Sequence, residues 1–207
     1  MKIICISDTH GFHRNLVIPP CDVLIHAGDI AAGRGSLLEL VAFNEWLVTV
    51  PAKHKLVIPG NHDFPFQRSE QRCRDILLAT VLIDQSITID GVSFYGSPWQ
   101  PWFYDWAFNQ ARGPLSAARW AKIPLTTNVL ITHGPPRGIL DETARGDSVG
   151  CDDLLARIQQ MPALKAHIFG HIHESSGVAK IYETTYVNAA ICNQLYDPVN
   201  PIRILEL

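Results

Sequence analysis

Aspartate and histidine residues follow several short apolar runs of the chain, at positions where they could act together. Five such runs end in polar motifs that contain a carboxylate, an amide or an imidazole: Asp8-Thr9-His10, Gly28-Asp29, Gly60-Asn61-His62-Asp63, His133-Gly134 and Gly170-His171-Ile172-His173. Five of the nine histidines lie in these motifs. In open α/β sheets ligands bind at the carboxyl ends of the strands, so we expect these side chains to converge.

Imidazole, carboxylate and amide groups are together the usual ligands of divalent and transition-metal ions. A donor set without thiolate indicates Mn²⁺, Fe, Zn²⁺, Co²⁺ or Ni²⁺ rather than Ca²⁺ or an iron–sulfur cluster. Two such ions about 3.5–4 Å apart can acidify a bridging water and clamp a phosphate, which is what hydrolysis of a phosphate ester at neutral pH requires.

The apolar runs that carry these motifs predict strands, because they are short and rich in β-branched residues. They are residues 2–7, 22–27, 55–59, 128–132 and 165–169, and their continuous apolar character is typical of strands covered on both faces. Further strands are expected at residues 87–89, 92–95, 178–182, 185–187 and 202–205, the first two joined by the hairpin signal Asp90-Gly91.

Helices are expected between these strands. Ser36 and Glu39 form a capping-box pattern at the start of a helix over residues 36–50, and residues 67–79 and 152–160 are further candidates. The irregular stretches are residues 98–113 and 134–150. The alternation predicts an α/β fold: a four-layer α-β-β-α sandwich of two mixed sheets packed together and flanked by helices, with a metal site at the strand carboxyl ends.

The composition limits the class of protein. At 207 residues, 47% hydrophobic and 18% charged, the chain is expected to form a single domain over residues 1–207. Its formal net charge of −3 argues against a general nucleic-acid coat. Five scattered cysteines form no Cys-x-x-Cys pair, and no signal peptide or apolar run of membrane-spanning length is present, which indicates a cytoplasmic protein without a membrane partner.

The order of the motifs resembles the calcineurin-like metallophosphoesterase superfamily, whose signature is D-x-H, G-D, G-N-H-[D/E], H and G-H-x-H. All five occur here in that order between Asp8 and His173. Three further segments are most similar to the small metallophosphoesterase-domain-containing branch: residues 96–103 (GSPWQPWF), 132–136 (THGPP) and 169–174 (FGHIHE). The resemblance covers almost the whole chain and implies two bound metal ions. Of the metals named above, we favour Mn²⁺.

The resemblance also assigns roles to individual residues. It implies that Asp29 bridges the two ions, with the first site completed by Asp8, His10 and His173 and the second by Asn61, His133 and His171. It further implies that His62 lies beside the metals without binding them, where it protonates the leaving oxygen or hydrogen-bonds the phosphoryl group. Asp63 could orient a catalytic imidazole or cap the following turn.

Four residues are candidates for contact with the substrate. Arg14 and Arg137 lie close to the motifs, and a guanidinium matches two phosphate oxygens, although an exposed loop charge explains them as well. Trp99 and Trp102 belong to an aromatic segment, residues 99–108, that either lines the substrate pocket or packs against the sheets.

The expected activity is hydrolysis of a small phosphodiester, such as a cyclic nucleotide, through a metal-bridging hydroxide. The diester preference comes from the resemblance to the smaller branch. A phosphomonoesterase or protein phosphatase on the same core is the alternative, and a non-catalytic metal-binding scaffold is disfavoured because no ligand is missing. A nuclease would need a basic stripe that the sequence lacks, so no long nucleic acid is expected as a partner. The sequence carries no prediction of oligomeric state.

Overall fold

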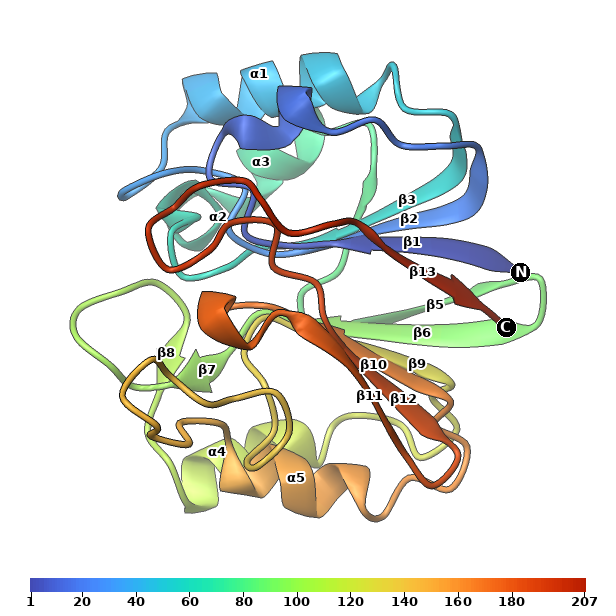
Figure 1. The fold of residues 1–207 in the computed structure, drawn as a ribbon, viewed down its shortest axis with the longest axis vertical. Helices are drawn as coiled ribbons and strands as arrows, with labels where there is room; N and C mark the ends of the chain where they lie inside the picture. The colour runs from blue at the N-terminus through green and yellow to red at the C-terminus, as the bar shows by residue number, and fades with distance from the viewer.

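The computed structural model describes all 207 residues and places two β-sheets face to face between helices (Figure 1). The first sheet has the order β13-β1-β2-β3-β4. Its strands are β1 (Lys2–Ile6), β2 (Cys21–Ala27), β3 (Ala52–Ile58), β4 (Thr80–Val81) and β13 (Arg203–Glu206).

The second sheet has the order β11-β12-β10-β9-β6-β5. Its strands are β5 (Gln85–Ile89), β6 (Val92–Ser97), β9 (Val129–Thr132), β10 (Ala166–Phe169), β11 (Gly177–Ile181) and β12 (Thr184–Asn188). A separate two-stranded ribbon pairs β7 (Gln100–Pro101) with β8 (Asn109–Gln110).

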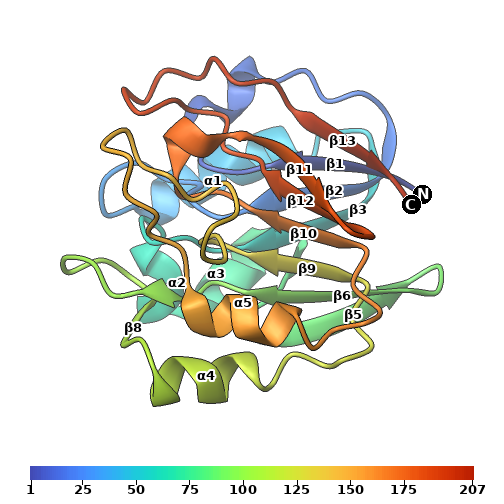
Figure 2. The same ribbon diagram turned by 60° about the horizontal axis from the view of Figure 1, so that its bottom comes forward.

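The helices form the two outer layers. Those beside the first sheet are α1 (Leu37–Leu47), α2 (Phe64–Arg68), α3 (Glu70–Ile76) and the 3-10 turn η1 (Phe12–Asn15). Helices α4 (Pro114–Trp120) and α5 (Asp152–Ile158) lie against each other on the outer face of the second sheet (Figure 2), and η2 (His173–Ser175) follows β10. The predicted α-β-β-α sandwich of two mixed sheets is confirmed.

Both faces of the central strands are buried, which explains their continuous apolar sequence. In β1, Ile3 and Cys5 point into the core between the two sheets, whereas Ile4 and Ile6 point into the core under α1. In β9, Ile131 faces the intersheet core, while its neighbour Leu130 faces the third core, under α4 and α5. Alternation across a strand sends successive side chains to opposite faces, so a strand buried on both sides needs no polar residues.

The parallel strands direct their carboxyl ends to one edge of the molecule. Strands β1, β2 and β3 run parallel in the first sheet, as do β6, β9, β10 and β12 in the second. At this edge, on the left in Figure 1, the two sheets are joined by main-chain hydrogen bonds: Ser7 N–H donates to Ala189 O at 2.9 Å, and Ile191 N–H donates to Ser7 O at 2.9 Å. The polar motifs of both sheets therefore lie at the same edge.

One helix prediction needs correction, and one helix was not predicted. The helix expected over residues 67–79 is two helices, α2 and α3, separated at Ser69, whose extended φ of −156° interrupts the helical hydrogen bonding. Helix α4 was not predicted, although Gly113-Pro114 places a proline at its first turn, the position where proline is favoured. The helix over residues 36–50 is observed as α1, where Glu39 N–H donates to Ser36 Oγ at 3.2 Å.

None of the helices has the length and apolar character required to cross a bilayer.

The packing of the two sheets can be tested at Phe94, which is fully buried in the intersheet core. We expect Phe94→Ala to lower the free energy of unfolding by about 3–5 kcal/mol, because it removes apolar contacts and leaves a cavity. Urea unfolding measures the loss. The control Leu115→Ala, on the exposed surface of α4, should change stability little; equal effects of the two variants would contradict this packing.

Candidate metal centre

The polar motifs converge where the two sheets join. Asp8 and His10 follow β1, Asp29 follows β2 and Asn61 follows β3, all on the first sheet; the second sheet supplies His133 after β9, and His171 and His173 after β10. All but His171 are almost fully buried. Three overlapping groups have potential ligand atoms within 4.8 Å of one another: Asp8/His10/His173, His10/Asp29/His62 and Asp29/His133/His171.

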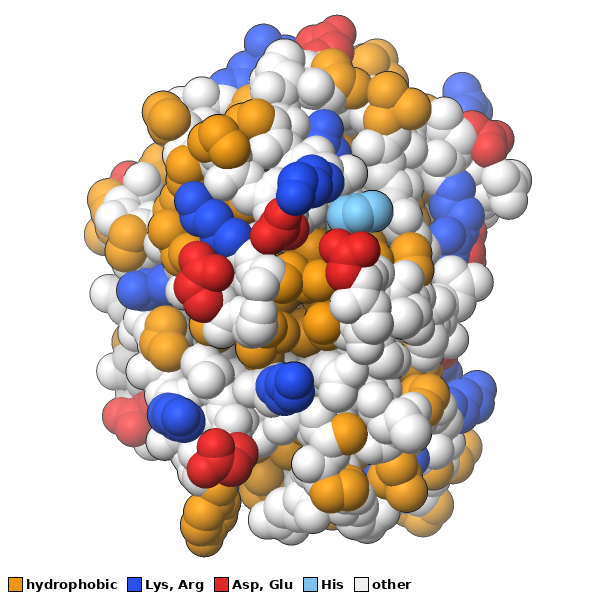
Figure 3. Space-filling view, turned by 90° about the vertical axis from the view of Figure 1, so that its right-hand side faces the viewer, with side chains coloured by type: hydrophobic (Ala, Val, Ile, Leu, Met, Phe, Trp, Pro, Cys, Tyr) orange, Lys and Arg blue, Asp and Glu red, His pale blue; other side chains and the backbone are white.

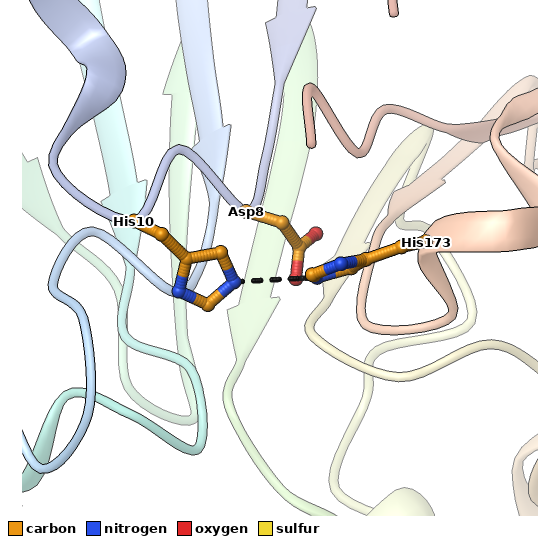
Figure 4. Close-up of side chains that lie close together, drawn as sticks. All are labelled: Asp8, His10 and His173. Carbon is orange, nitrogen blue, oxygen red and sulfur yellow. Dashed lines mark hydrogen bonds and ion pairs between the residues drawn. The ribbon is translucent and has the colours of Figure 1, made fainter. Parts of the chain in front are cut away.

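The first group contains Asp8, His10 and His173 (Figure 4). His173 Nε2 lies 3.2 Å from Asp8 Oδ1 and also 3.2 Å from His10 Nε2. The two imidazoles approach from different sheets and meet beside the carboxylate. This is the arrangement expected of three ligands that share one cation.

The second group surrounds Asp29. His133 Nε2 lies 2.8 Å from Asn61 Oδ1 and 3.4 Å from Asp29 Oδ2. The same Oδ2 atom lies 3.8 Å from His10 Nε2 of the first group. Asp29 therefore stands between the two groups, where the family resemblance placed a bridging carboxylate.

The histidine rings have their lone pairs turned inward. The Nδ1–H of His10 donates to Ala31 O at 3.1 Å, that of His133 to Ala27 O at 3.0 Å, and that of His173 to Asn193 O at 3.0 Å. Since a carbonyl only accepts, the neutral form of each ring keeps an unprotonated Nε2 that faces the other ligands. Acceptor atoms this close together need a positive charge among them, so the residues present fit divalent cations.

Close backbone packing brings the carboxylates to their positions. A Cβ atom at Gly60 would collide with the Asp29 carboxylate, and one at Gly170 with the Asp8 carboxylate, so only glycine fits at these two sites. Asp8, Asp29 and His171 have φ values of 51°, 57° and 70°, in the left-handed region that costs free energy for residues with a Cβ. The fold thus holds its ligands in strained conformations, as functional sites often do.

Neighbouring charges and burial shift the pKa values of most of these ligands in opposite directions. Burial acts to raise the pKa of Asp8, but the hydrogen bond and positive charge of His173 lower it below the usual value. The pKa of Asp29 is likewise lowered, chiefly by His133 acting against burial. In turn, burial disfavours the charged imidazoles, but Asp29 raises the pKa of His133 to about 9, and Asp8 raises that of His173 to about 9. Burial together with the charge of His133 lowers the pKa of His171 to about 3.

His62 lies next to the ligands and is oriented differently from them. Its Nδ1–H donates to Gly33 O at 2.6 Å, its main-chain N–H donates to Asp29 Oδ1 at 2.8 Å, and its ring packs on Trp106 with centroids 4.3 Å apart. Its Nε2 atom lies 3.9 Å from Asp29 Oδ2. The ring is therefore fixed beside the cluster, with Nε2 directed to the space in front of it.

Asp63 has a structural role in this arrangement. Its carboxylate accepts main-chain hydrogen bonds from Ile30 at 3.2 Å, Ala31 at 3.1 Å and Gly60 at 2.8 Å, and it makes no cap on α2. It ties the loop after β2 to the loop after β3. Burial and the nearby Asp29 raise the pKa of Asp63 to about 7.

Two cavities adjoin the ligand cluster. The first, which we call the metal cavity, has a volume of about 270 Å³, and its lining includes Asp29, Asn61, His62, His171 and His173. The second, which we call the side cavity, has a volume of about 360 Å³ and shares two residues with the first, Phe103 and His171.

Of the four candidate substrate contacts, only Trp102 lines one of these cavities, the side cavity. Arg14 points away and pairs with Glu45 at 2.8 Å, and the exposed Arg137 lines neither cavity. Trp99 packs beneath the guanidinium of Arg119, 3.6 Å from the ring centroid, with the edge of Phe108 beside it.

Four aromatic residues line the metal cavity and were not singled out from the sequence: Phe103, Tyr104, Trp106 and Tyr196. Phe103 and Trp106 belong to the aromatic segment already noted, and their ring positions follow from the loop between β7 and β8. Tyr196 approaches from near the carboxyl end of the chain, with its ring centroid 4.8 Å from that of His10. No motif marked it.

The ion pairs of the cluster predict how the stability of the metal-free protein depends on pH. The folded-state pKa of His133 and His173 lies near 9, above the ordinary value of 6.5. Their contribution is therefore complete below pH 6.5 and is lost as the pH rises through 9. Urea unfolding in chelator should show a loss on the order of a few kcal/mol between pH 7 and 9.5. A His133→Gln, His173→Gln double variant should show a clearly smaller loss, the remainder coming from the buried cysteines, whose pKa values burial raises. A wild-type loss no larger than that of the double variant would contradict the pairing.

Comparison with known proteins identifies the family. A model of the calcineurin-like phosphoesterase family matches residues 1–175. Metallophosphoesterase domain-containing protein 1 of Homo sapiens is 38% identical over 231 aligned residues, which cover 100% of this chain and 71% of that protein. A UPF0046 protein of Caenorhabditis elegans is 41% identical, covering 94% of this chain and 71% of its own length, and a second one is 35% identical, covering 96% and 79%.

The matched region contains all seven candidate ligands and His62, the residues from which the resemblance was inferred. The resemblance is confirmed, and the grouped aspartates and histidines agree with the metal dependence that the relatives' name states. The chain belongs to the calcineurin-like phosphoesterase family and has the character of a metal-dependent phosphoesterase.

Proposed function

We propose that this protein is a phosphodiesterase that holds two divalent cations, preferably Mn²⁺, and hydrolyses small phosphodiesters such as cyclic nucleotides. The observation that carries the proposal is the convergence of nitrogen and oxygen lone pairs from both sheets, with His62 beside them. We assign His62 to the substrate and not to a cation. Asp8, His10 and His173 would hold one cation and Asn61, His133 and His171 the other, with Asp29 shared.

Two bound divalent cations would supply an acidified water and neutralise charge on the phosphoryl oxygens. With +4 from the cations, −2 from Asp8 and Asp29 and −1 from a bound hydroxide, the loaded cluster would have a net charge of about +1. It would therefore attract an anionic phosphoester although the whole chain is acidic.

His62 is placed to handle the leaving oxygen. Because its Nδ1–H is committed to Gly33 O, only Nε2 is available to the metal cavity. The protonated ring can donate from Nε2 to an ester oxygen as the bond to phosphorus breaks. The packing on Trp106 holds the ring in this orientation, which lowers the entropic cost of the transfer.

The lining of the metal cavity supports a diester over a monoester. It contains the carboxylates Asp29 and Glu174 but no lysine or arginine. A monoester dianion would gain from an additional cationic side chain, whereas a diester carries a single negative charge and a second organic group. The aromatic rings of this cavity, among them Tyr104 and Tyr196, suit that group.

The surface charges and the cysteine side chains support a proposal about where the protein works and on what size of substrate. We propose that the chain works as one domain on small molecules in the cytoplasm. All five cysteines are buried and unpaired, which suits a reducing compartment. Figure 3 shows the face opposite the metal centre, where basic and acidic side chains are mixed and form no continuous basic stripe.

The reaction class can be tested with chromogenic substrates. We expect the Mn²⁺-loaded protein to hydrolyse bis(p-nitrophenyl) phosphate faster than p-nitrophenyl phosphate, because the metal cavity offers no extra cation to a dianion. Chelation should abolish both activities and added Mn²⁺ should restore them. Faster monoester turnover would favour a phosphomonoesterase, and no metal-dependent turnover of either ester would favour a non-catalytic scaffold.

The role of His62 can be separated from metal binding. Replacing it with alanine should lower kcat by about 10²–10⁴-fold, the usual contribution of a general acid, while bound metal measured by elemental analysis stays constant. The control His54→Ala changes an exposed histidine on β3, on the strand's amino-terminal half, and should leave kcat unchanged. Full turnover of the metal-loaded His62→Ala protein would exclude the proposed role.

A further inference from the structure

The side cavity adjoins the metal cavity and shares part of its lining. Phe103 and His171 line both spaces, and their rings meet edge to face with centroids 5.0 Å apart. His171 is itself a candidate ligand within 4.8 Å of Asp29 and His133. A molecule whose phosphoryl group lies at the ligand cluster can therefore extend an ester substituent past Phe103 into the side cavity.

Much of the lining of the side cavity is apolar. Besides Phe103 it includes Pro101, Trp102, Pro135, Val149 and Ile172. Its volume of about 360 Å³ falls within the range of small-ligand pockets, roughly 300–1,000 Å³. Proline and aromatic faces make large, rigid contacts that favour planar apolar groups.

The cavity offers no unpaired charge to a ligand. Its arginine, Arg112, donates to Gly150 O at 2.8 Å and to Val149 O at 2.7 Å, and lies 3.2 Å from Asp152 Oδ2. These bonds fasten the loop before α5 to the end of the β7–β8 ribbon, and the ion pair with Asp152 balances the charge of the guanidinium. Arg112 therefore forms part of the wall, and its charge is already paired.

The same loop is held from its other side, so the cavity is formed in advance. The Asp141 carboxylate accepts from Gly138 N–H at 2.9 Å, from Gly150 N–H at 2.9 Å and from the Ser148 hydroxyl. A preformed pocket binds its ligand at a lower entropic cost than one that must be ordered.

We propose that the side cavity is the subsite for one organic substituent of the substrate, and that this substituent is an uncharged planar ring such as an aryl group or a nucleobase. This inference rests on the proposed function, because it places the phosphoryl group at the metal cluster. Val149 and Trp102 are then specificity-determining residues, which recognise the substituent and take no part in bond cleavage.

Binding of two phosphonates to the Mn²⁺-loaded protein tests the subsite without requiring turnover. Phenylphosphonate and methylphosphonate carry the same anionic group and differ only in the organic part. By isothermal titration calorimetry, phenylphosphonate should bind about tenfold more tightly, the order of magnitude expected for burial of one ring after ordering costs. Equal affinities would overturn the inference.

Two variants test whether the preference for phenylphosphonate arises in the side cavity. Val149→Trp fills the cavity and Trp102→Ala, at an exposed position, removes part of its wall; each should abolish the advantage of phenylphosphonate and leave methylphosphonate binding unchanged. The matched control Val178→Trp, on the exposed edge strand β11, should retain the advantage. An advantage that survives both variants would also overturn the inference. If neither phosphonate binds the metal-loaded wild type but the chromogenic diester is hydrolysed, the subsite inference alone is overturned. If neither phosphonate binds and the diester is not hydrolysed, the proposed function fails as well.

Discussion

One constraint governs the structure around the site: acceptor atoms that repel one another are held close together in a buried space. Asn61 Oδ1 and His133 Nε2 are 2.8 Å apart, and His10 Nε2 and His173 Nε2 are 3.2 Å apart, although each of these rings gives its other nitrogen's proton to a main-chain carbonyl. Such contacts are stable only with positive charge between them. Divalent cations can provide this positive charge. In their absence protons provide it, because Asp29 raises the pKa of His133 and Asp8 raises the pKa of His173.

Much of the remaining architecture serves to keep these acceptors in place. Main-chain carbonyls at the end of β2, in the loop after it and near the carboxyl end of the chain orient the rings. Glycines allow the carboxylates to approach the backbone, and Asp63 fastens one loop to the next through three amide hydrogen bonds. The hydrogen bonds at Ser7 join the sheets at the same edge. A site built from loops gains its precision in this way from rigid strands directly behind it.

The order of the layers and the ligand motifs could be predicted from the sequence because both are local signals. Apolar runs buried on both faces mark the strands, and each ligand follows the end of one of them. The contacts around the site could not be predicted in this way. Trp99 and Trp102 are three residues apart in one aromatic segment, but the turn into the β7–β8 ribbon sends one beneath Arg119 and the other to the side cavity. Tyr196 comes from an irregular stretch, where no periodicity indicates direction. The division between α2 and α3 depends on the backbone of one serine.

The division of the ligands between the two sheets has a consequence for how the molecule is made. Both aspartates and Asn61 belong to the amino-terminal sheet, whereas three of the four histidine ligands belong to the later one, the last at residue 173. During synthesis on the ribosome the carboxylates emerge well before the imidazoles that complement them. Each half of the site is incomplete alone, so the full set of candidate ligands exists only once the second sheet has docked on the first.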